Sequence, residues 1–274
     1  MSDKSVGDSL HGGEGEGNEA SGNWSAVAGG SNNHARAQYS TVAGGVSNFA
    51  SSGTTAVGAT VGGGGNNNAN GQYSTVPGGR FNTILADYGF AAGSSARVNS
   101  GHDGAFVWAD NDNLTFGSVA ANELAARARG GVRFVTAING SGAPTAGVAV
   151  AAGDSAWSVI SDRHAKENWV DVDGREVLER VAALPIGEWS YKAQGSDVRH
   201  MGPAAQDFHA AFGLGHSNRS ITTVDADGVA LAAIKGVHAL LVRHGDTIRE
   251  QAREIEQLRA ELRSMRELLV ATRP

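Results

Sequence analysis

Ser161 and Lys166 are the residues whose types and spacing point most directly to chemistry; they lie in the stretch SAWSVISDRHAKENW, Ser155–Trp169. A serine hydroxyl is a weak nucleophile until a base takes its proton. A lysine amine can take that proton only in its neutral form, which burial or nearby positive charge favours. The pair therefore raises the question whether the chain is cut at its own position.

The same residues also fit a purely structural role. Ser161 or Asp162 could accept backbone N–H hydrogen bonds at the start of a helix, with Lys166 pointing to solvent. A serine five residues before a lysine arises readily by chance in a serine-rich chain. The spacing alone leaves both interpretations open, so the surrounding elements must decide between them.

Two compositions meet close to this stretch. Of the 39 glycines in the 274 residues, thirty lie in residues 1–160 and nine in residues 161–274. Seven basic residues precede Ser161 and fifteen follow it. The length allows one large or two ordinary domains. The composition favours two units with a boundary near residues 150–160.

The glycine-rich part contains an internal repeat. NWSAVAGGSNNHA begins at Asn23, QYSTVAGGVSNFA at Gln38 and QYSTVPGGRFNTI at Gln72, and a looser copy begins at Asp87. Each copy predicts a short strand, a Gly-Gly corner and a polar turn. Units this short are expected to stack as the coils of a β-roll or β-solenoid. The alternative is an irregular glycine-rich linker, against which the aromatic at a fixed offset argues.

This repeat resembles the head repeats of trimeric autotransporter adhesins and phage tail fibres. By that resemblance, GAFVWAD (Gly104–Asp110) is expected to be the last coil of the stack. Residues 120–129 are expected to form a short helix ended by Gly130–Gly131. Residues 132–138 are expected to form a strand, and the alternating stretch 142–160 is expected to form strands against neighbouring chains.

After Ser161 the pattern changes to mixed helices and strands. Apolar residues at helical spacing predict a helix over Arg175–Ile186, which Pro185 ends. Gly187–Lys192 alternates as a strand, and RHMGPAAQDFHAAFGL predicts a strand and then a short helix from Pro203. SITTVDADGVA, residues 220–230, predicts another strand with an Asp-Gly turn. A long helix is expected from about Ala230 to Ala271.

That long helix carries a heptad pattern typical of a coiled coil. The a positions are Ile234, Leu241, Ile248, Ile255, Leu262 and Leu269, and the d positions are Val237, His244, Gln251, Leu258 and Met265. Polar His244 and Gln251 are expected to fix register at some cost in packing. Gly245, beside His244, is expected to mark the break between a packed helix and the free coiled coil. A single amphipathic helix packed on its own domain is the alternative, and heptads alone do not separate a dimer from a trimer.

From Ser161 onward, about 114 residues resemble the peptidase S74 family, the intramolecular chaperone domain of phage tailspike endosialidases and of the myelin regulatory factor. The resemblance rests on four stretches in the family's order, which are SDRHAKEN, LPIGEWSYK, HMGPAAQDF and VDADGVALAAIKGVHALL. It implies self-cleavage immediately before the serine. Ser161 would be the nucleophile, Lys166 the general base and Ile160–Ser161 the bond that is cut. Asp162 would give structural support, and Arg163 would add positive charge.

The resemblance also implies a homotrimer in which the C-terminal domain folds an upstream β fibre and is then released. The predicted fold class is an N-terminal all-β repeat, a trimeric β-roll or β-solenoid stalk, followed by a C-terminal α+β chaperone domain that ends in a long coiled-coil helix. The predicted domains are residues 1–22 disordered, 23–110 the β repeat, 111–160 a β connector, 161–233 the chaperone domain and 234–274 the coiled coil.

Composition argues against several other classes. The net charge of -6 does not favour a nucleic-acid partner. The absence of cysteine rules out disulfides. No basic segment leads into an apolar one as in a signal peptide, and no apolar run approaches the ~20 residues of a membrane span. His200, His209 and His216 lack the paired spacing of metal ligands, so neither metal nor cofactor is expected.

The sequence therefore predicts a trimeric fibre whose C-terminal chaperone cuts itself off, located in a virion tail fibre or on a bacterial surface. One alternative is a trimerisation module of a surface adhesin or tail fibre that never cuts. A second is an adhesin head whose repeats bind a host-cell surface receptor or glycan. A fragment beginning at Ser161 would separate the self-cleaving chaperone from the module that never cuts, whereas glycan or cell binding by residues 23–160 alone would support the adhesin head.

Overall fold

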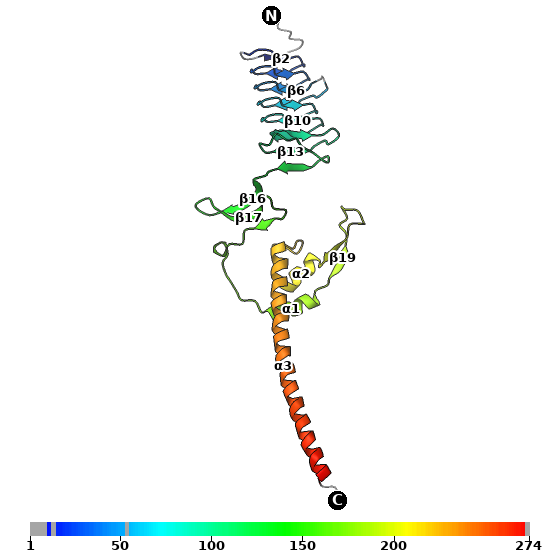
Figure 1. The fold of residues 1–274 in the computed structure, drawn as a ribbon. Coiled ribbons are helices and arrows are strands. Elements are labelled where there is room, and N and C mark those ends of the chain that lie inside the picture. The colour runs from blue at the N-terminus through cyan, green and yellow to red at the C-terminus, as the bar shows by residue number, and fades with distance from the viewer. Residues whose placement is uncertain (1–9, 12–14, 53–54, 272–274) are drawn as a thin grey trace. The chain divides into compact units, whose positions relative to one another are not determined.

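A computed structural model describes residues 10–11, 15–52 and 55–271 of the chain (Figure 1). The chain divides into two compact units, Met1–Ile160 and Ser161–Pro274, and each is described by itself. Within the described residues, no helix is long and apolar enough to cross a membrane.

The N-terminal unit is a β-solenoid, as the repeat predicts, in which each coil adds one short strand to each of two parallel sheets (Figure 1). The eight-stranded sheet is β1 (Leu10–His11), β3 (Ala26–Val27), β5 (Thr41–Val42), β7 (Thr60–Val61), β9 (Thr75–Val76), β11 (Phe90–Gly93), β13 (Phe106–Ala109) and β15 (Leu124–Arg127). The seven-stranded sheet is β2 (Glu19–Ala20), β4 (His34–Ala35), β6 (Phe49–Ala50), β8 (Asn68–Ala69), β10 (Thr83–Ile84), β12 (Ala96–Val98) and β14 (Phe116–Gly117).

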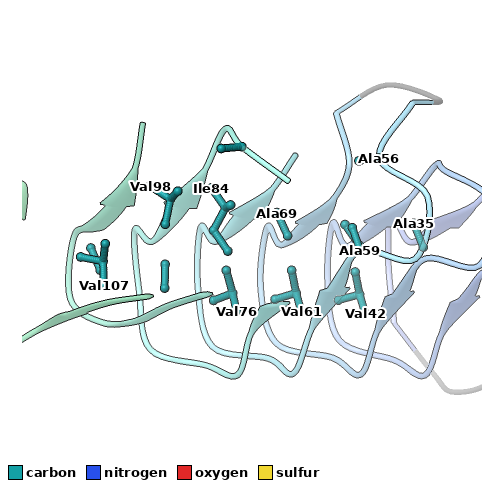
Figure 2. Packing of buried hydrophobic residues seen from close by; sticks show 14 of the residues in the cluster. Ala35, Val42, Ala56, Ala59, Val61, Ala69, Val76, Ile84, Val98 and Val107 are labelled. Carbon is teal, nitrogen blue, oxygen red and sulfur yellow. The ribbon is translucent and has the colours of Figure 1, made fainter. Parts of the chain in front are cut away.

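The core of the solenoid is a column of small apolar side chains, one inward residue for each short strand. Figure 2 shows Val42, Val61 and Val76 from one sheet lying in a row, opposite Ala69 and others from the second sheet. These side chains are fully buried. Alternation along a strand sends the next residue outward, so a two-residue strand supplies one core residue. Stacking coils is what joins these single residues into a continuous core.

A ladder of buried asparagines runs along one corner of the solenoid. The fully buried members are Asn33, Asn48, Asn67 and Asn82. In each, the side-chain Nδ2 donates to glycine carbonyls; that of Asn33 donates to Gly29 at 2.9 Å and to Gly45 of the next coil at 2.8 Å. Its Oδ1 accepts the backbone N–H of Asn48 at 3.1 Å. The ladder thus pairs backbone groups that a buried corner would otherwise leave unsatisfied.

The Gly-Gly corners require glycine for two reasons, a left-handed backbone conformation and the close approach of the next coil. Gly45 has φ +90°, a region that L side chains rarely adopt. A Cβ built on Gly45 would lie 2.2 Å from the carbonyl oxygen of Gly64 in the next coil. The coils therefore approach too closely at this corner for any larger residue.

The recurring aromatics lie outside the core, at a second left-handed corner. Trp24, Tyr39, Tyr73 and Tyr88 have φ between 53° and 59° and are all exposed. The rings of Trp24 and Tyr39 stack with centroids 5.1 Å apart, and those of Tyr73 and Tyr88 are 5.7 Å apart. The aromatic signal in the repeat therefore marks a stacked surface column, whereas valine and alanine form the core.

Three expectations for this unit are wrong in part. Disorder was expected over residues 1–22, and residues 1–9 and 12–14 lie outside the described part. However, Glu19–Ala20 forms strand β2 and Leu10–His11 forms β1. Gly104–Asp110 is not the last coil, since β13 pairs with β15 of a further coil. The helix expected over residues 120–129 is strand β15, because the parallel edge of β13 offers it ladder hydrogen bonds that a short helix cannot match.

The Glu19 carboxylate makes the stability of the first described coil depend on pH. Burial opposes ionisation, but hydrogen bonds from Ser21, Arg36 and His34 outweigh it and lower the pKa of Glu19 from 4.5 to about 2. A lowered carboxyl pKa stabilises the fold above the unfolded pKa, and this contribution is lost as pH falls through the folded value. We expect Glu19→Gln to destabilise the chain most above about pH 5 and least near pH 2. Urea unfolding across this pH range measures the difference in free energy of unfolding between Glu19→Gln and the wild type. A difference that does not change with pH would contradict the prediction.

A separate antiparallel sheet follows the solenoid. It contains β16 (Gly131–Ile138), β17 (Pro144–Ala151) and β18 (Ser158–Val159), in that order (Figure 1). Residues 131–160 are all described and none is buried. The exposed apolar side chains include Phe134, Ile138 and Trp157. The predicted strands are confirmed, but in a single chain this sheet has no core of its own.

The C-terminal unit is a small α+β arrangement around one long helix, which confirms the predicted fold class. It contains α1 (Gly174–Ala183), the antiparallel pair β19 (Gly187–Trp189) and β20 (His200–Gly202), α2 (Ala205–Phe212) and α3 (Thr223–Ala271). Helix α1 begins at the Asp173 cap and packs on α3, where a Cβ on Gly236 would meet the Gly174 carbonyl oxygen at 2.2 Å. The buried apolar residues are Phe208, Val229 and Ala233.

The strand expected over residues 220–230 is wrong, because α3 already begins at Thr223. Thr222 caps it: its hydroxyl accepts the Asp225 N–H at 3.1 Å and donates to the Asp225 carboxylate at 2.8 Å. The β-branched residues favoured a strand, but this reciprocal pairing at the helix start outweighs their preference. The helix runs through Gly245 without interruption.

The heptad side chains of α3 are exposed within the single chain. Ile234, Leu241, Ile248, Leu258, Leu262 and Met265 are each more than half exposed. No described side chain of α3 beyond Gly236 is buried. The helix therefore presents an apolar seam that its own unit does not cover.

Candidate active site

The residues around Ile160–Ser161 are held on the N-terminal side by the small sheet. Ile160 follows β18, and its N–H donates to the carbonyl of Gly147 in β17 at 3.2 Å. The hydrogen bond fixes the backbone just before the bond in an extended, exposed conformation. Extended and accessible backbone is the form in which peptide bonds are generally cut.

A short 3₁₀ turn, η1 (Arg163–Ala165), lies between Ser161 and Lys166. Its cap is Asp162, whose side chain accepts the His164 N–H at 2.9 Å. The turn ends at Lys166, whose own N–H donates to the Arg163 carbonyl at 3.2 Å. Asp162 therefore caps a single 3₁₀ turn and not an α-helix.

The turn brings the predicted pair together. Lys166 Nζ donates to Ser161 Oγ at 2.6 Å. An extended segment of this length would separate its ends by far more than a lysine side chain can span, so the turn is needed for the contact. Both residues are exposed in the single chain. A neutral amine at this distance could accept the serine proton, which is the geometry that a serine–lysine mechanism requires.

A residue that the sequence analysis missed, Trp169, lies beside this pair. Lys166 Nζ is 5.6 Å from the centre of the Trp169 ring, and Arg163 Cζ is 5.4 Å from it. Asn168 has φ +56°, a left-handed conformation that asparagine tolerates, and it turns the chain just before the ring. The sequence places an aromatic residue three positions after a lysine and six after an arginine. This spacing does not show that the three side chains meet, because their contacts depend on the conformation of the turn.

His200 and His209 make hydrogen bonds with partners other than Ser161, Lys166 or each other. His200 Nε2 lies 2.8 Å from Gln194 Oε1, and His209 Nδ1 lies 2.9 Å from the Leu214 carbonyl. Among residues 10–11, 15–52 and 55–271, no three His, Asp or Glu side chains are grouped so as to hold a metal ion. The contacts of these histidines are structural.

The fold and the site together define a class of protein, a β-solenoid fibre segment followed by an α+β domain that opens on a Ser-Lys pair. Residues 161–213 match the model of the peptidase S74 family, described as chaperone of endosialidase. The match begins at Ser161 and supports a chaperone role for a fibre. Neither the curated proteins nor the solved structures gave a significant match to the chain.

Proposed function

We propose that the C-terminal unit is an intramolecular chaperone that trimerises, assists the folding of the upstream β fibre and then releases itself by cutting the Ile160–Ser161 bond. The observation that carries this proposal is the 2.6 Å contact between Lys166 Nζ and Ser161 Oγ at the first residue of the family match. A structural N-cap role for Ser161 is disfavoured, because the cap of the turn is Asp162.

The proposed reaction proceeds in two steps within one chain. The neutral amine of Lys166 takes the hydroxyl proton of Ser161, and Oγ attacks the carbonyl carbon of Ile160. The C–N bond then breaks, the Ser161 nitrogen takes up a proton, and the Ile160 carbonyl is left as an ester on Oγ. Water hydrolyses the ester, which leaves a carboxylate at Ile160 and a free amine and hydroxyl at Ser161.

Trimerisation is supported by apolar surface that a single chain leaves uncovered. The seam of α3 and the sheet β16–β18 both expose large apolar side chains, and residues 131–160 contain no buried residue. Exposed apolar area of this extent marks an interaction surface. A heptad seam is best covered by identical helices, which favours further copies of this chain.

A chaperone that holds chains together suits this fibre. Every strand pairing in the solenoid is parallel and joins one coil to the next. A growing stack of coils exposes an unpaired strand edge until the next coil is added. A clamp that fixes the register and is removed after folding would leave the fibre kinetically trapped.

The proposal is tested on the purified full-length chain by denaturing gel and intact mass. Cleavage predicts two fragments, of which the C-terminal one begins at Ser161. An intact chain under conditions where it forms a trimer would overturn the peptidase part. An intact trimer would instead favour the alternative, a trimerisation module that never cuts. The exposed seam of α3 supports that alternative.

The seam itself is tested by Ile248→Asp. Ile248 is 64% exposed in the single chain and would be buried at an a position of the coiled coil. Placing carboxylates in one buried layer is expected to weaken association by about a hundredfold or more. Sedimentation of the chain carrying Ser161→Ala, which stays uncut, measures this effect.

The matched control is Arg253→Asp, which places the same charge outside the a and d positions. This control is expected to keep the oligomer of the parent chain. Equal behaviour of the two variants would show that the seam is not the interface.

A further inference from the structure

We infer that Trp169 is a positioning residue for the self-cleavage reaction, and that its ring holds the Lys166 amine beside Ser161. The inference rests on the proposed function and adds a third residue to it. It is carried by the distances from the ring centre, 5.6 Å to Lys166 Nζ and 5.4 Å to Arg163 Cζ. Both lie within the range in which a cation is attracted to an aromatic face.

Lys166 needs such a support because its side chain lies on the surface. A free lysine side chain loses rotamer entropy when it is held in one conformation. Only the single contact with Ser161 Oγ fixes its amine by hydrogen bonding among the described residues. The Trp169 ring adds a second contact, which limits the positions that the amine can sample and keeps it near the hydroxyl.

Burial does not explain where Trp169 lies. Its side chain is 64% exposed, although tryptophan usually gains most by burying its area. The chain instead adopts a left-handed turn at Asn168 immediately before it. A large aromatic side chain that is placed beside two cations by an uncommon backbone conformation fits a role in holding those cations.

Arg163 gives the ring its own anchor. A guanidinium is planar and weakly hydrated, so it stacks on aromatic rings more readily than an ammonium does. Arg163 belongs to η1, the turn that spaces Ser161 and Lys166. Through Arg163, the ring is tied to the same turn that positions the pair, so that the amine, the hydroxyl and the ring form one local unit.

The kinetic test compares Trp169→Phe, which keeps an aromatic face, with Trp169→Leu, which does not. Trp169→Leu is expected to cut about two- to fivefold more slowly than the wild type, because the ring stabilises the ammonium that forms when the Lys166 amine takes the serine proton, and this is the size of effect that an exposed cation–π contact carries. Trp169→Phe is expected to restore most of the rate. The control Val170→Ala changes the adjacent exposed residue and is expected to leave the rate unchanged.

A spectroscopic test reads the same contact without cleavage. The chain has four lysines, so the ¹³Cε signals of lysine-labelled protein are few enough to assign. In the uncut Ser161→Ala chain, the ring current of Trp169 is expected to shift the Lys166 signal upfield. That shift should persist in Trp169→Phe and vanish in Trp169→Leu, while the signals of Lys192 and Lys235 stay in place.

The outcomes separate this inference from the function on which it rests. If the wild type never cuts, the proposed function fails, and the shift of the Lys166 signal still decides whether the ring holds the amine. If the wild type cuts and Trp169→Leu cuts equally fast, or if Trp169→Phe is as slow as Trp169→Leu, the positioning role is overturned. An unshifted Lys166 signal in the uncut chain also overturns it.

Discussion

Ser161→Ala is expected to leave the chain intact on a denaturing gel, because no other described hydroxyl lies within hydrogen-bonding distance of the Lys166 amine. Lys166→Ala is expected to have the same effect, since the hydroxyl then loses its base. Losing either member of a nucleophile–base pair commonly removes nearly all of the rate, on the order of a thousandfold or more. Intact mass after prolonged incubation measures the residual cleavage.

Two matched controls make this result specific. Ser155→Ala removes an exposed hydroxyl six residues before Ser161, and Lys192→Ala removes a lysine elsewhere in the C-terminal unit. Both are expected to cut at the wild-type rate. Cleavage at Ile160–Ser161 that persists in Ser161→Ala would show that Ser161 and Lys166 do not carry out the cleavage.

Asn48→Ala is expected to cause a large loss of stability in the solenoid. Its Nδ2 donates to the Gly44 carbonyl at 2.9 Å, and its Oδ1 accepts the Asn67 N–H at 3.1 Å. Truncation leaves both groups unpaired in a fully buried corner, at a cost of about 1–3 kcal/mol each. The free energy of unfolding is therefore expected to fall by about 2–6 kcal/mol, which hydrogen exchange of residues 44–67 can localise.

Asn23→Ala is the matched control for this prediction. Asn23 is exposed at a turn, and its replacement is expected to change the free energy of unfolding by less than about 0.5 kcal/mol. Faster exchange in Asn48→Ala that is confined to the two coils around residue 48 would agree with a local corner role. Equal stability of the two variants would mean that water replaces the lost amide.

The solenoid could be predicted from the sequence because its signal is periodic. The repeat fixes the coil length, and Val between small residues marks the inward position, as in Val42 and Val76. The role of the asparagines could not be predicted in the same way. Asn32 and Asn33 are adjacent in the chain, but Asn32 adopts the left-handed turn and only Asn33 joins the buried ladder. That distinction depends on partners in the next coil.

The errors lie where tertiary partners outweigh local preference. Residues 124–127 favour a helix by composition, but the parallel edge of β13 recruits them into a strand. Residues 223–230 favour a strand by their β-branched residues, yet the pairing of Thr222 with Asp225 begins a helix. In both cases the deciding hydrogen bonds involve groups that a pattern of apolar residues does not register.

For the candidate site, the sequence predicted the pair but not its geometry. Spacing and resemblance pointed to Ser161 and Lys166, whereas the contact between them depends on the single turn of η1. Trp169 was missed because its position depends on the left-handed conformation of Asn168. Asparagine tolerates that conformation without requiring it, so the chain reversal could not be inferred from residue type.

The asparagine ladder also bears on how such a fibre could change over generations. Each rung bonds to the coil before it and the coil after it in the same way, and the rungs at Asn33, Asn48 and Asn82 follow the same register. Loss or duplication of one whole repeat would therefore rejoin equivalent rungs. Recombination between the repeated gene segments would lengthen or shorten the stalk in whole coils and leave the domain beyond Ser161 untouched.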